Sequence, residues 1–125
     1  MVKTILVVDD EPDILLTVAQ TLEIYGYNII KAKNGQECIE KLCEMRDNPD
    51  LVLLDIMMPG MSGWDVFNRI HKKSTQIKVA FMSVLEISDK RKQVLLDEGL
   101  ADYIMKPFDK ETLLNRVDKI LTEKE

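Results

Sequence analysis

The amino-acid sequence predicts one compact α/β domain built on a sheet of parallel strands. Short apolar runs alternate along the chain with longer amphipathic stretches, and no segment is repeated or of low complexity. Two of the runs, Ile5–Val8 and Leu51–Leu54, contain no polar residue, which is typical of strands buried on both faces of a sheet. With 125 residues, 46% of them hydrophobic, we expect residues 1–125 to form a single domain.

The first half of the chain predicts two strands and two helices. After the run Ile5–Val8, Pro12 suits the first turn of a helix, and apolar residues recur at helical spacing until Gly26 ends it. Residues 28–32 form a short second strand. Asn34 then caps a second helix, because its side chain can accept a hydrogen bond from the free N–H groups of the first turn.

The middle of the chain predicts the third and fourth strands with a helix between them. The run Leu51–Leu54 ends at Asp55, and Pro59 and Gly60 force the chain to turn. Ser62 caps the third helix. Residues 78–82 form the fourth strand, and Ser83 stands at its carboxyl end.

The last part predicts the remaining two helices and one strand. The fourth helix opens at Ser88 and carries three cations in its first turn, where they oppose the helix dipole, so we expect it to be held less tightly than the others. Residues 102–105 form the fifth strand. Lys106 follows at its carboxyl end, and Asp109 caps the last helix.

Acidic residues follow two of the buried strands, Asp9 and Asp10 after the first and Asp55 at the end of the third. If these strands are neighbours, the three carboxylates converge. Two carboxylates about 4 Å apart repel by roughly 4 kcal/mol at an effective dielectric constant of about 20. Helix capping explains one such acid but not the whole set. With oxygen ligands only, the group predicts a site for a hard divalent cation, Mg²⁺.

The overall charge and the cysteines limit the classes of partner. A net charge of −5 and a pI near 5.0 argue against a nucleic-acid or anionic-membrane surface, so protein partners are expected. Cys38 and Cys43 lie on one predicted helix, too far round it to form a disulfide. No signal peptide or long apolar segment precedes them, which predicts reduced thiols and a cytoplasmic location.

Taken together, these residues resemble the receiver domains of two-component response regulators, with the chemotaxis response regulator as the single-domain example. The resemblance covers the whole chain and rests on Val7-Val8-Asp9-Asp10-Glu11, Asp55, Met58-Pro59-Gly60-Met61-Ser62-Gly63, Ser83 and Lys106-Pro107-Phe108. It implies a flavodoxin-like doubly wound fold, with five parallel strands in the order 2-1-3-4-5 and five helices.

The resemblance also implies roles for the acidic residues. Asp55 is the expected phosphoacceptor. Asp10 and Asp55 would ligate Mg²⁺ directly, together with the backbone carbonyl of Met57, and Asp9 would bind the ion through water.

Three further residues receive roles from the same resemblance. Lys106 would pair with Asp55 and then with the phosphoryl group, its position often fixed by a cis bond to Pro107. Ser83 would bind a phosphoryl oxygen, and Tyr103 would move inward with it. By residue type alone, Ser83 is equally a hydroxyl that begins a turn and Tyr103 equally a half-buried sheet aromatic; only their register with Asp55 and Lys106 favours the functional roles.

The function implied is phosphoryl transfer from the phosphohistidine of a histidine kinase to Asp55. The face formed by the fourth helix, the fifth strand and the fifth helix would then change for a downstream protein target or a fused output domain. The donor is a histidine kinase or a phosphotransfer protein. We expect a monomer or a phosphorylation-dependent dimer that catalyses only its own phosphorylation and dephosphorylation, and that binds neither nucleic acid nor membrane.

The sequence argues against two other functions, and it departs from the family pattern at one position. A phosphohydrolase of the aspartyl-phosphate type has a second Asp two residues after its nucleophile, where this chain has Met57. A flavin-binding domain needs a phosphate loop after the first strand, where three acids stand instead. The residue after the switch hydroxyl is usually small in the family, and here it is Val84, which we expect to narrow access to the phosphorylation site.

Overall fold

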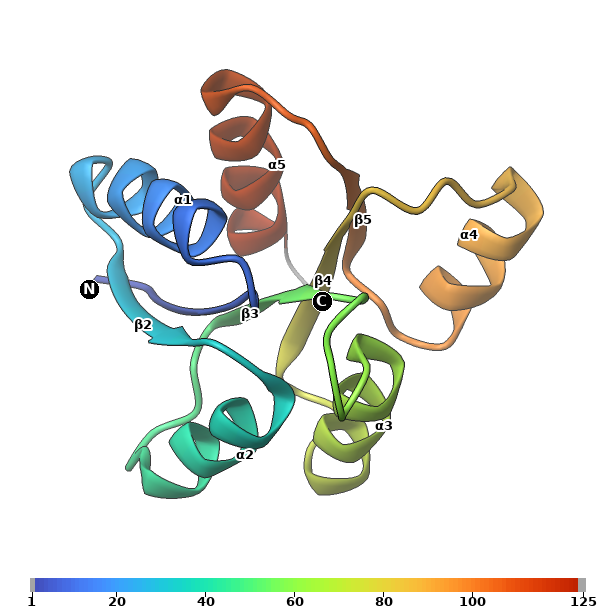
Figure 1. The fold of residues 1–125 in the computed structure, drawn as a ribbon, viewed down its shortest axis with the longest axis horizontal. Coiled ribbons are helices and arrows are strands. Elements are labelled where there is room, and N and C mark those ends of the chain that lie inside the picture. Colours follow the sequence, from blue (N-terminus) through green and yellow to red (C-terminus); the bar gives the residue numbers. More distant parts are fainter. Residues whose placement is uncertain (1, 124–125) are drawn as a thin grey trace.

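Strands and helices alternate strictly along the chain in the computed structural model, which describes residues 2–123 (Figure 1). The five strands are β1 (Thr4–Val8), β2 (Asn28–Ala32), β3 (Leu51–Asp55), β4 (Lys78–Ser83) and β5 (Asp102–Met105). The five helices are α1 (Pro12–Ile24), α2 (Gly35–Glu44), α3 (Gly63–Lys73), α4 (Asp89–Asp97) and α5 (Lys110–Thr122). Every strand and helix predicted from the sequence is present.

The five strands form one parallel sheet in the order β2-β1-β3-β4-β5. The chain therefore winds first to one edge of the sheet and then, from β3 onward, to the other. This is the flavodoxin-like doubly wound fold, and the prediction is confirmed. In such a sheet the point where the winding reverses lies between β1 and β3, and there the loops at the carboxyl ends separate and leave room for a site.

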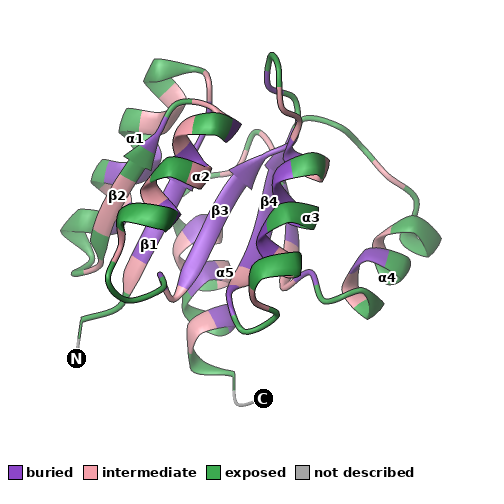
Figure 2. Cartoon of the chain, turned by 90° about the horizontal axis from the view of Figure 1, so that it is seen from below, coloured by how far each residue is buried: buried purple, intermediate pink, exposed green. Residues whose placement is uncertain are grey.

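Helices cover both faces of the sheet (Figure 1). On one face α1 and α5 pack against alternate strand residues such as Leu51 and Leu53. On the other face α2, α3 and α4 pack against Val52, Leu54 and Phe81. β3 is buried along its whole length, and β4 is buried from its second residue onward, as Figure 2 shows. Each buried Leu or Val contributes about 1.5–3 kcal/mol, so the strand ends are held by a rigid core.

The predicted helix starts are confirmed. The Asn34 side chain accepts a hydrogen bond from the N–H of Glu37 at 2.7 Å, and Asp109 accepts one from Thr112 at 2.7 Å. Ser62 and Asp65 form a reciprocal capping box at the start of α3. At the other end of α1, Gly26 has a φ of +105°, a left-handed conformation that glycine adopts without strain.

The two cysteines differ in their surroundings. Cys38 is fully buried, and burial raises the pKa of its thiol to about 12. Cys43 is exposed, and both are free thiols, as predicted. No helix within residues 2–123 is long and apolar enough to cross a membrane.

Candidate phosphorylation and metal site

Three carboxylates meet at the carboxyl ends of β1 and β3. Asp9 and Asp10 follow β1 and Asp55 ends β3, and one oxygen from each lies within 4.8 Å of the other two. Asp9 is fully buried, Asp55 is 4% exposed and Asp10 is partly exposed. The convergence predicted from the sequence is therefore present, because β1 and β3 are neighbours in the sheet.

Asp9 is fixed by one contact on each oxygen. Its Oδ1 accepts a hydrogen bond from the backbone N–H of Glu11 at 3.0 Å, and its Oδ2 lies 2.7 Å from the Nζ of Lys106. A fully buried carboxylate needs such partners, because burying an unpaired charge costs several kcal/mol. Asp9 therefore both shapes the start of α1 and contributes charge to the site.

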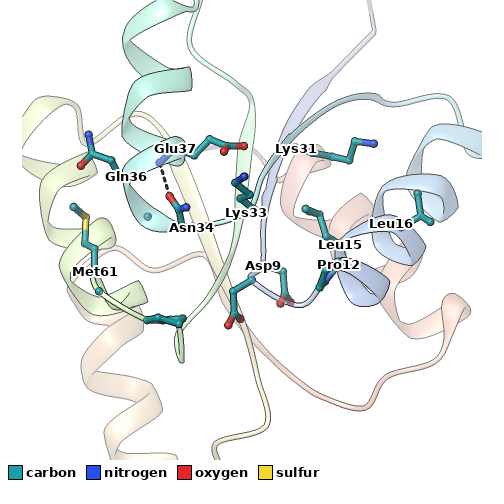
Figure 3. A pocket seen from close by; sticks show the side chains of 14 residues that line it. Asp9, Pro12, Leu15, Leu16, Lys31, Lys33, Asn34, Gln36, Glu37 and Met61 are labelled. Carbon is teal, nitrogen blue, oxygen red and sulfur yellow. Dashed lines mark hydrogen bonds between the residues drawn. The ribbon is translucent and has the colours of Figure 1, made fainter.

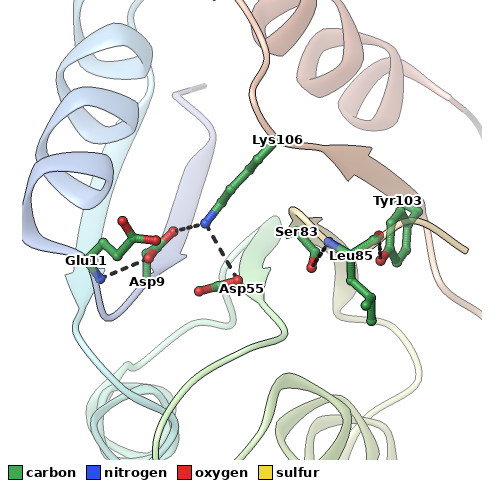
Figure 4. A network of polar contacts seen from close by, with 7 residues as sticks. All are labelled: Asp9, Glu11, Asp55, Ser83, Leu85, Tyr103 and Lys106. Carbon is green, nitrogen blue, oxygen red and sulfur yellow. Dashed lines mark hydrogen bonds and ion pairs between the residues drawn. The ribbon is translucent and has the colours of Figure 1, made fainter.

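Lys106 reaches from the end of β5 between two carboxylates (Figure 4). Its Nζ lies 2.7 Å from Asp9 and 3.6 Å from Asp55, so the pairing expected with Asp55 is present but is the longer of the two. The backbone N–H of Lys106 donates to the carbonyl of Ser83 at 2.8 Å, which ties the ends of β4 and β5 together. The peptide bond from Lys106 to Pro107 is cis.

The surroundings of Asp55 disfavour its charged form. Burial and then repulsion by Asp9 raise the pKa of Asp55 to about 6, against a smaller lowering by Lys106 and by the backbone of Met57. Lys106 is thus shared between the two buried carboxylates, Asp9 and Asp55, and a third carboxylate, Asp10, lies beside them. The site carries more negative charge than its own cation balances.

This donor set fits a hard divalent cation. All three side chains offer oxygen ligands, which Mg²⁺ prefers, and an added cation would offset the charge that raises the pKa of Asp55. Met57 lies two residues after Asp55, with an exposed side chain and a backbone close enough to influence Asp55.

Ser83 and Tyr103 meet at a third residue, Leu85 (Figure 4). The hydroxyl of Ser83 accepts a hydrogen bond from the N–H of Leu85 at 3.0 Å. The hydroxyl of Tyr103 donates to the carbonyl of the same residue. Ser83 is fully buried and Tyr103 is 3% exposed, so the tyrosine is not half-buried. It already lies inward, whereas an inward movement was expected only together with Ser83. Both side chains hold the segment that leads to α4.

Gly63 has a structural role that the sequence analysis did not predict, although the residue is part of the motif after Asp55. A Cβ atom there would lie 2.5 Å from the carbonyl oxygen of Asp55 and 2.6 Å from the Cα of Ile56. Instead, its backbone N–H donates to Ile56 at 2.8 Å. The start of α3 is thereby pressed against the end of β3, and this close approach fixes the loop beside Asp55.

Several grooves open beside the acids, and two of them border α1. The larger, about 820 Å³, lies between α1, the start of α2 and the loop after β3, and its lining includes Asp9, Leu15, Lys33 and Met61 (Figure 3). The smaller, about 360 Å³, lies between α1 and the loop after β5 and includes Lys106 and Phe108.

Val84 lines the smaller groove and is 62% exposed. It thus shares this groove with Lys106, one of the site residues, and most of its side chain faces solvent. Any hindrance by Val84 therefore acts on molecules that approach from outside.

Comparisons with known proteins agree with this geometry. A family model described as the response regulator receiver domain matches residues 5–118. The chain is 33% identical over 120 residues to the phosphate regulon transcriptional regulatory protein PhoB of Pseudomonas aeruginosa, which covers 95% of this chain and 52% of PhoB. Several curated relatives are similarly long, so that this chain spans about half their length.

Two further relatives match over nearly their full length. The protein PilH of Pseudomonas aeruginosa is 31% identical over 118 residues, covering 94% of this chain and 96% of PilH. The crystal structure of the response regulator TrrA of Thermotoga maritima, in complex with Mg²⁺ and BeF, superposes with a TM-score of 0.80 at 37% identity, covering 95% of this chain and 99% of TrrA. The chain belongs to the receiver domains of two-component response regulators.

Proposed function

We propose that Asp55 accepts a phosphoryl group from the phosphohistidine of a histidine kinase or a phosphotransfer protein. The observation that carries this proposal is the position of Asp55, a buried carboxylate at the end of the central strand that faces Lys106 and two further acids. A structural carboxylate would be placed where its charge is balanced. Asp55 instead lies where a nucleophile for phosphoryl transfer needs to be, among groups that bind cations and phosphoryl oxygens.

The transfer needs little covalent chemistry from the protein. An oxygen of Asp55 forms a bond to phosphorus while the bond from phosphorus to the histidine nitrogen breaks, and the electron pair returns to the imidazole. Lys106 then pairs with a phosphoryl oxygen. Asp9, Asp10 and Asp55, with the backbone carbonyl of Met57, would hold Mg²⁺, whose charge offsets the carboxylates and the phosphoryl oxygens. The Mg²⁺ in the TrrA complex supports this choice of ion.

The phosphoryl group also offers Ser83 a new acceptor. Its hydroxyl leaves Leu85 and donates to a phosphoryl oxygen, which frees the segment before α4, and Tyr103 follows that segment because its hydroxyl holds the same residue. The surface formed by α4, β5 and α5 then changes for its target. The target is a downstream protein or an output domain attached to residues 1–125, as the length of the transcriptional regulators among the relatives suggests. The same surface would serve a phosphorylation-dependent dimer.

The test is phosphorylation by a small donor. Incubation with acetyl phosphate and Mg²⁺ should add one phosphoryl group, detected by intact-protein mass and lost on treatment with hydroxylamine. Asp55→Asn should abolish the addition, whereas Asp47→Asn, at an exposed acid outside the site, should leave it unchanged. Phosphate found on Ser83, or retained by Asp55→Asn, would overturn the proposal.

A further inference from the structure

The helix α4 buries little of its own surface. Within it only Leu95 is buried, whereas Val94 is 45% exposed. Its first turn carries Lys90, Arg91 and Lys92, whose charges oppose the helix dipole. Contacts at the two ends of α4 are therefore important for holding the helix in place, and both come from α3.

The contact at the beginning of α4 is a cation over an aromatic ring. The guanidinium carbon of Arg91 lies 5.4 Å from the centroid of the Trp64 ring, in the first turn of α3. Trp64 is itself held by Phe81 of β4, edge to face with ring centroids 5.0 Å apart. Such an arrangement attracts the cation to the ring, and it costs little to break because the arginine is exposed.

The contact at the far end of α4 is a close backbone approach. Gly99 ends the helix with a φ of +109°, and a Cβ atom there would lie 2.7 Å from the Cε1 of His71. The His71 ring lies near the end of α3 and packs at a tilt against the Phe67 ring, with ring centroids 4.2 Å apart. This end of α4 packs closely against α3, and any side chain larger than hydrogen at position 99 would collide with His71.

The aromatic rings behind both contacts, Trp64 and Phe67, pack against the same ring of the sheet, Phe81. Phe81 meets Trp64 at 5.0 Å and Phe67 at 5.6 Å. It also meets Tyr103 at 6.2 Å, and the hydroxyl of Tyr103 holds Leu85 at the start of the segment before α4. The first turn of α4 is thus the end of the helix that lies nearer to Leu85 along the chain. Its contact with α3, through Arg91, is weaker than the contact at the other end, through Gly99.

We propose that the Arg91–Trp64 contact is a latch that holds the beginning of α4 against α3, with the His71–Gly99 contact as the pivot at the other end. Arg91 is then a positioning residue for the surface of α4. The latch belongs to the unphosphorylated protein. Its use in signalling rests on the proposed function, because phosphorylation would act on it through Ser83, Leu85 and Tyr103.

The test is amide hydrogen exchange in α4 without any phosphoryl donor. Arg91→Gln should make the amides of residues 93–97 exchange about two- to five-fold faster, since an exposed cation over an aromatic ring contributes a factor of that size. Lys90→Gln is the matched control, because it removes the same charge from the same turn without touching Trp64. If the only effect were to remove a cation that opposes the helix dipole, amide exchange would be slower or unchanged in both variants. The latch predicts faster exchange in Arg91→Gln and slower or unchanged exchange in Lys90→Gln.

Two further variants identify the partner of Arg91. Trp64→Leu should speed exchange in α4 as Arg91→Gln does, and the two changes together should do no more than one alone. Arg91→Lys keeps a cation and should show a smaller effect. Exchange no faster in Arg91→Gln than in Lys90→Gln, or additive effects in the double variant, would overturn the latch. Failure of Asp55 to take up phosphate would instead refute the proposed function and leave this measurement unaffected.

Discussion

Asp55 and Asp102 are both poorly exposed carboxylates next to a cation, yet their pKa values move in opposite directions. At Asp55, burial and the nearby Asp9 raise the pKa to about 6, and Lys106 is 3.6 Å away. At Asp102, burial also acts to raise the pKa and is the largest single influence, but hydrogen bonds from Arg116 and from the N–H of Tyr103 outweigh it and leave the pKa lowered. The two sites lie at opposite ends of their strands.

The difference lies in how far each charge is balanced, and the less balanced carboxylate is the one that we propose as phosphoacceptor. Arg116 donates to both oxygens of Asp102, at 2.6 and 2.7 Å, so that this charge is fully balanced and joins α5 to β5. Lys106 is shared between Asp9 and Asp55, so the charge of Asp55 is only partly balanced. The structure thus stabilises the ionised form of Asp102 and destabilises the ionised form of Asp55, an imbalance that a bound cation would offset.

The largest expected effect is the pH dependence contributed by Asp55 in the absence of metal. Between its ordinary pKa of 3.8 and the folded value of about 6, the folded state binds more protons than the unfolded state. The free energy of unfolding should therefore fall as the pH rises through this window, by up to about 3 kcal/mol. Asp55→Asn should be about as stable as the parent below the ordinary pKa of 3.8 and more stable than the parent above pH 7.

Urea unfolding in EDTA at several pH values measures this difference. Asp102→Asn serves as the contrast, because a carboxylate with a lowered pKa stabilises the fold above its ordinary pKa, and that stabilisation is lost as the pH falls through the folded pKa. Asp102→Asn should therefore be less stable than the parent at pH 7. Equal pH profiles for the parent and Asp55→Asn would refute the idea that Asp55 carries unbalanced charge.

The second effect is stabilisation by Mg²⁺. An ion that binds only the folded state contributes about 2.7 kcal/mol at a concentration 100-fold above its dissociation constant. The melting temperature should therefore rise with millimolar Mg²⁺ at pH 7. Asp10→Asn should reduce this response and stabilise the metal-free protein, because it removes one of three mutually repelling carboxylates.

Thermal melting with and without Mg²⁺ checks this, and Asp102→Asn again provides the contrast. It leaves the three acids in place, so it should keep the full response to Mg²⁺. A response in Asp10→Asn as large as in the parent would count against this metal site.

The third effect is the cost of separating Asp102 from its partner. Arg116→Met should destabilise the protein at pH 7 by about 1–2 kcal/mol, a modest figure because both side chains are partly exposed to solvent. Asp102→Asn in the same chain should recover part of the loss, since no unpaired carboxylate then remains. Chemical unfolding of the two single variants and the double variant measures the coupling. Additive losses would mean that the pair is not a structural unit.

The smallest effect concerns Val84 beside the phosphorylation site. Hydrolysis of phospho-Asp55 needs a water in line with phosphorus, and displacing a reactant by 1 Å can cost about 100-fold in rate. Because Val84 is 62% exposed, we expect only a few-fold faster loss of phosphate in Val84→Ala and a stability change below about 0.5 kcal/mol. Mg²⁺ affinity should be unchanged. Single-turnover phosphate release measures the rate.

Two comparisons make the Val84 result specific. Val94→Ala removes the same atoms from an exposed valine on α4 and should leave the rate unchanged. Repeating Val84→Ala in a Tyr103→Ala background removes any contribution from a movement of the Tyr103 side chain. Phosphate loss no faster than in the parent in both backgrounds would show that Val84 does not shield the site.

The strand ends and most residues of the candidate site were predictable because one physical rule places them. Apolar runs mark buried parallel strands, and the carboxyl ends of such strands share one edge. Asp9, Asp55, Ser83 and Lys106 each follow or end such a run, so their neighbourhood follows from topology. The fourth helix was predicted to be weakly held from its cations, and it has the fewest buried residues of the five.

Pairings between side chains were not predictable in the same way. Lys106 lies closer to Asp9 than to Asp55, and no sequence pattern encodes which of two neighbouring carboxylates a lysine approaches more closely. The pairing of Arg116 with Asp102 and the contact of Arg91 with Trp64 depend on how helices rotate against the sheet and against each other. Their residue types are common on exposed helix faces, so the sequence offers no signal that singles them out.

The contrast between the two cysteines has a practical consequence for fluorescence measurements on this protein. A thiol reacts with maleimides as the thiolate, so Cys38, buried and with a pKa of about 12, is inert, while the exposed Cys43 is accessible. The natural chain therefore accepts one dye at the end of α2 without mutagenesis. The single Trp64 near α4 is a native donor for such a dye. Together they form a donor–acceptor pair for energy-transfer measurements of the distance between α2 and the start of α3.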